Sequence, residues 1–187
     1  MTGQPTEATD LGEAVRRAQA GDPEAFGTLY DAYVDRIFRY VRIRVGDDVE
    51  SEDLTEHVFL RAWQAIGRYQ DRGRPFTAWL YTIAGNVVSD YFRSQRRRAA
   101  LDPVLVDRAT DRDPVAAAER GAHRAALENA IRKLTPDQQQ VIILRFIEGL
   151  SPAEVAATIG KREGTVRVIQ HRALAALRSL LAAEVVT

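Results

Sequence analysis

The chain contains no cysteine among its 187 residues. This absence excludes a disulfide-stabilised fold, a zinc site with thiolate ligands and a cysteine nucleophile. No stretch is apolar over the roughly 20 residues that a membrane-spanning helix needs. Residues 1–10 are polar and acidic, without the basic start or the apolar centre of a signal peptide. We therefore expect a soluble, cytoplasmic protein that makes no membrane contact of its own.

Neither sign of charge is in excess. The 26 basic and 26 acidic residues give a formal net charge of zero, which by itself argues against a nucleic-acid-binding protein. The distribution is uneven, however: residues 47–56 are acidic without a basic residue, and residues 93–98 include four arginines without an acid. One run could face a basic protein and the other could face phosphates, or both could be solvated helix surface.

Patterns typical of β-strands are also missing. Residues with β-branched side chains never alternate with polar ones over a strand length, whereas apolar residues recur at spacings of three and four. Asp22 and Pro23 are typical of the start of a helix, and Gly46 of its end. Further helices are predicted over about 50–66 and 75–98, so we expect an all-α fold.

Residues 99–118 are mainly acidic and small, and two Asp-Pro pairs interrupt their periodicity. We interpret them as a flexible linker between two small helical domains. The predicted organisation is an N-terminal segment with a short helix at 1–20, a first domain at 21–98, the linker at 99–118 and a second domain at 119–187.

The second domain contains the pattern of a helix-turn-helix. Residues 151–154, Ser-Pro-Ala-Glu, form a capping box with proline at the first helical position, and Gly160 ends this short helix. The next helix is apolar on one arc and basic on the other, which suits a helix that enters the major groove. A basic helix face can also be plain solvated surface. The residues expected to face DNA are Arg162, Gly164, Thr165, Arg167, Val168, His171 and Arg172.

The helix predicted over 75–98 is amphipathic. Its apolar side includes Leu80, Ala84 and Val87. Its polar side forms a stripe of Thr82, Asn86, Ser89, Asp90, Arg93 and Arg97. Trp79 lies at the border between the two sides, so it could pack in the core or stack on an exposed base.

Three stretches, in this order, resemble the extracytoplasmic-function group of the sigma-70 family. The first is Ser-Glu-Asp-Leu-Thr-Glu-His-Val-Phe-Leu-Arg-Ala-Trp at 51–63, and the second is Pro-Phe-Thr-Ala-Trp-Leu-Tyr-Thr-Ile-Ala-Gly-Asn at 75–86. The third runs from Leu134-Thr135-Pro136 through Gly164-Thr165-Val166-Arg167 to His171-Arg172-Ala173. The resemblance covers about residues 21–181, and we expect no regulatory domain after that point.

The resemblance implies a role for each part of the chain. Residues 21–98 correspond to sigma region 2, which docks on core RNA polymerase and melts the −10 promoter element. Residues 119–187 correspond to region 4, which reads the −35 element, and the acidic linker threads toward the polymerase active-site channel. The implied partners are core RNA polymerase, promoter DNA and an anti-sigma factor. No cofactor, metal ion or catalytic residue is implied, so we do not expect an enzyme.

The resemblance also implies which residues make these contacts. Those implied to bind core polymerase are Asp53, Leu54, Glu56, His57, Phe59 and Leu60. Those implied to contact −10 DNA are Tyr69, Trp79, Thr82, Asn86, Asp90, Arg93 and Arg97, with Asn86 at the position of a base-reading asparagine. The −35 contacts are the seven residues of the helix-turn-helix named above.

Two stretches depart from the family pattern. Residues 53–57 are Asp-Leu-Thr-Glu-His, where the family commonly has Asp-Leu-Val-Gln-Glu. Residues 168–170 are Val-Ile-Gln in place of Ser-Arg-Leu, so either Ile169 or Gln170 fills the inward position of that helix.

Two other classes of function are open to the sequence. A stand-alone helix-turn-helix regulator would account for the second domain. It would not account for the acidic helix predicted over about 50–66 (the Asp53 helix) or for the polar stripe that contains Asn86 (the Asn86 stripe). An enzyme is less consistent, because the three histidines are far apart and neither a His-Glu-x-x-His motif nor a glycine-rich phosphate loop is present.

The charge balance leads to a further hypothesis. We expect the free chain to bind duplex DNA weakly and to need core polymerase to hold its two domains at promoter spacing. A partner that clamps the domains together and masks the Asp53 helix would then act as a regulator.

Overall fold

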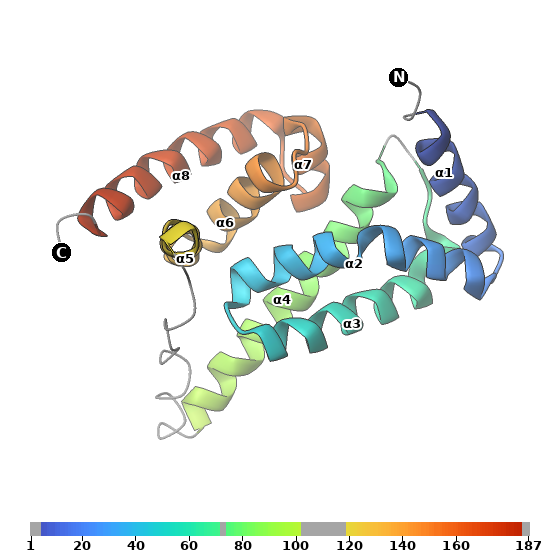
Figure 1. The fold of residues 1–187 in the computed structure, drawn as a ribbon, viewed down its shortest axis with the longest axis horizontal. Coiled ribbons are helices and arrows are strands. Elements are labelled where there is room, and N and C mark those ends of the chain that lie inside the picture. The colour runs from blue at the N-terminus through green and yellow to red at the C-terminus, as the bar shows by residue number, and fades with distance from the viewer. Residues whose placement is uncertain (1–4, 72–73, 102–118, 185–187) are drawn as a thin grey trace.

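The computed structural model describes residues 5–71, 74–101 and 119–184 of the chain. Within these ranges every regular element is helical, as the sequence predicts (Figure 1). The helices form two groups, one before and one after the interval 102–118. That interval contains most of the predicted linker and lies outside the described residues.

The first group comprises α1 (Pro5–Gln19), α2 (Pro23–Val45), α3 (Asp48–Ala65), the 3-10 turn η1 (Ile66–Arg68) and α4 (Phe76–Leu101). The Asp22 carboxylate caps α2 by accepting from the amides of Glu24 and Ala25, and Gly46 ends the helix at a φ of 80°. The core between these helices contains side chains with almost no exposure, among them Leu29, Ile37, Val58 and Val88. Helix α4 extends three residues beyond its predicted end at 98, into the start of the predicted linker.

The second group comprises α5 (Glu119–Arg132), α6 (Pro136–Ile142), the π-helical turn η3 (Ile143–Ile147), α7 (Pro152–Ile159) and α8 (Glu163–Glu184). The sequence also predicts one continuous helix over 136–148. In the structure the second half of this stretch widens into η3. There the Glu148 amide donates to the Ile143 carbonyl, five residues back, and the Leu150 amide donates to the Leu144 carbonyl at 2.9 Å. Gly149, at a φ of 75°, allows the chain to turn into α7.

Helices α7 and α8 form the predicted helix-turn-helix. The Ser151 hydroxyl accepts from the Glu154 amide and the Glu154 carboxylate accepts from the Ser151 amide, which completes the capping box. Gly160 ends α7 at a φ of 68°. Val166, Ala173 and Leu177 bury one side of α8 against the other helices of the group.

The two groups are in direct contact, an arrangement that the sequence does not predict. Helix α4 packs against α7, and α2 packs against α5 (Figure 1). Gly85 of α4 permits one close approach, because a Cβ atom at that position would lie 3.2 Å from the amide oxygen of Gln140.

Candidate nucleic-acid interface

The exposed face of α3 carries most of the residues predicted to bind polymerase. Asp53, Glu56, His57 and Leu60 are exposed, and Leu54 is half-buried. Leu60 has 55% of its surface exposed. The face therefore combines carboxylates with an accessible apolar side chain.

Phe59, which was placed in the same set, belongs to the core. It is only 5% exposed, and its ring lies 4.7 Å from the ring of Tyr30 and 6.5 Å from that of Phe26, measured between centroids. Of these two adjacent residues, only Leu60 presents its apolar side chain to a partner.

A shallow groove next to this face was not found from the sequence. It has a volume of about 300 Å³ and lies between α2 and α3. Its lining comprises Tyr30, Val34, Asp35, Phe38, Glu52, Thr55 and Glu56. The sequence signals this groove only by the recurrence of aromatic residues along 23–45. The groove extends the acidic and apolar character of α3 onto a second helix.

The polar stripe of α4 is accessible along part of its length. Asn86, Arg93 and Arg97 are exposed, and Thr82 is half-buried. The Asp90 carboxylate forms ion pairs with Arg93 and Arg61, both at 3.2 Å. Both pairs are well exposed to solvent, so they contribute little to stability and can exchange for other partners.

The two aromatic candidates for base stacking lie in one cluster. The Tyr69 ring is 5.1 Å from the Trp79 ring and 5.6 Å from the Phe76 ring. Tyr69 is 8% exposed and its hydroxyl donates to the Arg74 carbonyl at 2.8 Å, and burial raises the pKa of this phenol. Trp79 is half-buried at the edge of the cluster, so it is better placed than Tyr69 to meet a base.

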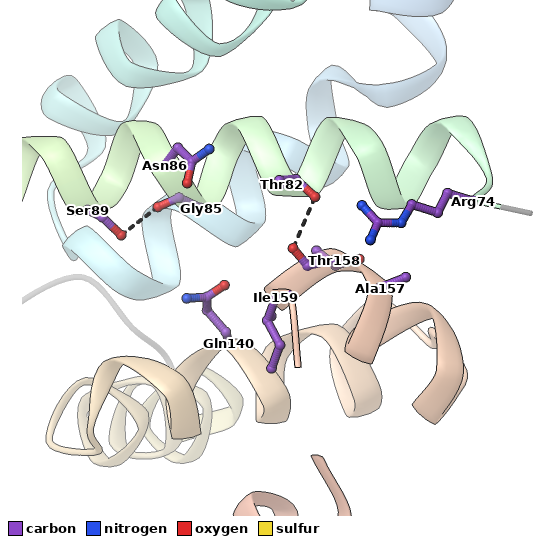
Figure 2. A pocket seen from close by; sticks show the side chains of 10 residues that line it. Arg74, Thr82, Gly85, Asn86, Ser89, Gln140, Ala157, Thr158 and Ile159 are labelled. Atoms are coloured by element: carbon purple, nitrogen blue, oxygen red, sulfur yellow. Dashed lines mark hydrogen bonds between the residues drawn. The ribbon is translucent and has the colours of Figure 1, made fainter. Parts of the chain in front are cut away.

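The N-terminal half of the stripe faces the second group of helices. Thr82, Gly85, Asn86 and Ser89 line one wall of a pocket of about 250 Å³, and the opposite wall includes Gln140 and residues 157–160 (Figure 2). The Thr82 hydroxyl donates to the Thr158 carbonyl at 3.0 Å. In this arrangement α7 covers part of the surface that the sequence assigns to −10 DNA.

The predicted reading arc of α8 is accessible along its whole length. All seven of its residues, from Arg162 to Arg172, are exposed. Val168 has 51% of its surface exposed. Arg167 forms an ion pair with Glu163 at 2.7 Å, between side chains that are largely solvated. The arc can therefore approach a groove without rearrangement of the helix.

Ile169 and Gln170 share the inward position that the sequence left open, since both are partly buried. Ile169 packs against the core, and the Gln170 amide oxygen accepts from Arg145 Nε at 3.4 Å. The Arg145 guanidinium also donates to the Leu150 carbonyl, so it ties α8 to the turn before α7. Nothing in the sequence around Arg145 indicates this role.

Two family models match the chain, one in each group of helices. Residues 29–98 match the family described as Sigma-70 region 2, and residues 130–179 match that described as Sigma-70, region 4. The chain is 43% identical to the ECF RNA polymerase sigma factor BldN of Streptomyces coelicolor, over 94% of this chain and 67% of that one. It is 36% identical to the ECF RNA polymerase sigma factor SigD of Mycobacterium tuberculosis, over 92% and 84%.

The chain belongs to the ECF RNA polymerase sigma factors.

Solved structures have the same fold as this sigma factor. CnrH, in complex with the cytosolic domain of CnrY, superposes with a TM-score of 0.71 at 26% identity, over 91% of this chain and 96% of that one. The sigma factor RpoE of Bartonella quintana, in complex with the anti-sigma factor NepR, gives 0.66 at 22% identity over 84% and 96%, a likeness of fold alone. A stand-alone regulator is therefore not favoured, because region 2 would have no role in it.

A buried carboxylate joins the two regions of the sigma factor. The Glu148 side chain is 1% exposed, and its Oε2 accepts from Arg36 Nε at 3.1 Å and from the Tyr81 hydroxyl at 2.6 Å. Burial, the hydrogen bond to Glu148 and the charge of that carboxylate all raise the pKa of the Tyr81 phenol, so it remains a proton donor. This cluster was missed from the sequence, where Glu148 is only the last residue of a predicted helix.

Two kinds of site are absent from the described ranges. In residues 5–71, 74–101 and 119–184 no helix is both long and apolar enough to cross a membrane. The same residues contain no group of three potential metal ligands of the His, Cys, Asp or Glu type.

The contrast between Phe59 and Leu60 is testable by their truncation. Phe59→Ala should lower the free energy of unfolding by about 3–5 kcal/mol, because it leaves a cavity in the core. Leu60→Ala should change it by no more than about 0.5 kcal/mol, because that side chain is mostly solvated. Urea unfolding followed by circular dichroism measures both, and equal losses would show that Leu60 is also part of the core.

Proposed function

We propose that this sigma factor uses three separate surfaces on its two regions. The α3 face with Asp53, Glu56, His57 and Leu60 binds core RNA polymerase, and half-buried Leu54 supports it. The α4 stripe with Thr82 and Asn86 opens and reads the −10 element. The exposed arc of α8 reads the −35 element. The observation that carries the proposal is the presence of an accessible acidic-apolar helix face and an accessible basic reading helix on one chain.

The chemistry of each surface suits its assignment. Carboxylates around an exposed leucine complement a basic protein surface with an apolar centre, as in many protein interfaces. The amide of Asn86 can pair with a base edge, while Arg93 and Arg97 further along α4 can hold phosphates. In α8 the small residues Gly164 and Thr165 let the helix approach DNA closely. Trp79 is the aromatic side chain that stacks on a base of the opened −10 element.

The domain limits follow from the same surfaces. Residues 21–98 form the part that binds polymerase and melts DNA, and residues 119–187 form the −35 reader. We assign the interval 99–118 to the connection between them. The protein acts as a non-enzymatic initiation factor in the cytoplasm, where polymerase and promoter DNA are found.

Regulation by an anti-sigma factor is part of the proposal. CnrH, which is 26% identical to this chain, was solved with the cytosolic domain of a second protein. A partner of this kind would cover the α3 face or hold the two regions together, and either contact would keep polymerase from binding.

Binding to polymerase is the first test of the proposal. Core RNA polymerase purified from Streptomyces coelicolor should form a complex with the full chain that survives size-exclusion chromatography. The reconstituted enzyme should start transcription at discrete sites on genomic DNA. Leu60→Glu should weaken the complex with core enzyme at least about tenfold, because it adds charge at an apolar contact. Tight binding of the chain alone to duplex DNA, with no polymerase complex, would instead favour a stand-alone regulator.

The role of Asn86 is separable from polymerase binding. We expect Asn86→Ala to retain affinity for core enzyme and to reduce promoter opening by about 1–3 kcal/mol, or five- to 150-fold, through loss of a base contact. Permanganate reactivity of the −10 thymines measures opening. A template that is mismatched over the −10 element should recover part of the loss, and an Asn86→Ala protein with normal opening would contradict the assignment.

The role of α8 is tested by two arginines of the same helix. Arg167→Ala should lower transcription from a promoter with a −35 element by about five- to 150-fold, the range for one specific base contact. Arg178→Ala is the matched control, since Arg178 is also exposed but lies about three turns further along α8. Equal effects of the two substitutions would show a general electrostatic contribution and no base reading at Arg167.

A further inference from the structure

Helix α2 carries three partly exposed arginines that the three proposed surfaces do not include. Arg36, Arg39 and Arg42 are spaced by three residues, which places them on successive turns along one side of the helix. All three side chains are partly exposed, at 36%, 41% and 28%. We refer to them as the α2 arginine row.

Each member of the α2 arginine row contacts a carboxylate from the second region. Arg36 pairs with Glu148 at 3.1 Å, and its second nitrogen donates to the Glu148 carbonyl at 3.2 Å. Arg39 lies 3.5 Å from the other carboxylate oxygen of Glu148. Arg42 donates to both oxygens of Glu128, at 2.7 and 2.9 Å. Two negative groups of α5 and the η3–α7 turn thus lie along a row of three positive ones.

The α2 arginine row is continuous with the stripe proposed to read −10 DNA. Tyr81 of α4 shares the Glu148 carboxylate with Arg36, and the next residue, Thr82, donates to the Thr158 carbonyl. Asn86 lines the pocket one turn further along α4 (Figure 2). One side of the first region therefore carries both the base-reading stripe and the arginines. The second region contacts all three arginines and Thr82 of the stripe, while Asn86 stays exposed.

We propose that the α2 arginine row is a binding site for DNA phosphates, which Glu148 and Glu128 occupy when the two regions are in contact. The carboxylates take the place of phosphate oxygens, to which arginine binds by similar charge-assisted hydrogen bonds. This inference rests on the proposed function, because it assigns the DNA surface of the same −10 reader. In the free chain the contact between the regions thereby keeps phosphates from the α2 arginine row until the regions separate.

The contacts at Glu148 suit an exchange of partners. Its Oε1 is buried and lies in the field of Arg39, yet no hydrogen bond reaches it in the described structure. Separation of the regions would hydrate this carboxylate, and a buried ion pair gains little over its solvated partners. The arginines are already partly solvated, so a phosphate can approach them from the open side.

The test uses the full chain and a fluorescein-labelled, mixed-sequence single-stranded DNA of about 20 nucleotides, longer than one typical single-strand site. Glu148→Gln retains the size of the side chain and removes its charge. We expect tighter binding by about fivefold or more. The slope of log K against log salt should steepen by about 1.4, since each of two released arginines adds about 0.7. Unchanged affinity and slope would overturn the proposal.

A second substitution in the same background distinguishes a DNA site from a contact that only holds the regions together. Adding Arg39→Gln to Glu148→Gln should reduce the slope by about 0.7 and weaken binding, because a phosphate contact is lost. Arg16→Gln in that background is the matched control, since Arg16 is exposed on α1 away from the row. If Arg39→Gln leaves binding unchanged or tightens it, the arginine has no role in DNA binding and the proposal fails.

A second variant tests the α2 arginine row if the first does not fold. If Glu148→Gln does not fold by circular dichroism, Glu128→Gln tests the row through Arg42. This variant is compared with Arg124→Gln as its parent, because Arg124 also pairs with Glu128 at 3.0 Å. The expected steepening is then about 0.7. The probe needs neither polymerase nor a promoter, so the outcome is independent of the proposed function. If the wild-type chain supports transcription but the variants bind single-stranded DNA like the wild type, the arginine site is contradicted and the proposed function is not. If the variants show the expected changes in DNA binding but the chain forms no complex with polymerase, the proposed function is contradicted and the arginine site is not.

Discussion

Helix α2 has to pack against four other helices, and the rest of the structure depends on this constraint. It contacts α1, α3 and α4 within the first region and α5 in the second. Tyr40 shows how the helix meets two demands at once. Its ring packs 5.3 Å from the ring of Tyr81, and its hydroxyl accepts from the buried guanidinium of Arg44 at 2.9 Å. The apolar side of α2 therefore packs in the core of the first region, while the α2 arginine row contacts carboxylates of the second region.

The sequence predicted those features that depend on local periodicity. The capping box at Ser151, the turn at Gly160 and the exposed arc of α8 all follow from residues close together in the chain, and the structure has each of them. Adjacent apolar residues were harder to separate. Phe59 and Leu60 are both at the edge of an amphipathic face. The first is buried because the rings of Tyr30 and Phe26 pack against it, and the second is mostly exposed.

Contacts between distant residues lay beyond prediction for a physical reason. Arg36 and Glu148 are 112 positions apart, and nothing in their neighbours marks a pair. Tyr69 is similar, because its burial depends on Phe76 and Trp79 across a loop. The zero net charge, which first argued against a nucleic-acid binder, also has a different meaning in three dimensions. Part of the acidic charge faces arginines of the same chain, so the sum says little about any one surface.

The burial of Glu148 also constrains how the sequence can diverge. A substitution that removes Arg36 or Arg39 leaves an acid with fewer partners in a dry environment, whereas loss of the acid leaves two cations facing each other. Either loss alone lowers the stability of the contact between the regions, whereas loss of the acid together with the arginines can leave it unchanged. Because these contacts join the two regions, we expect positions 36, 39, 81 and 148 to change together when such sequences diverge.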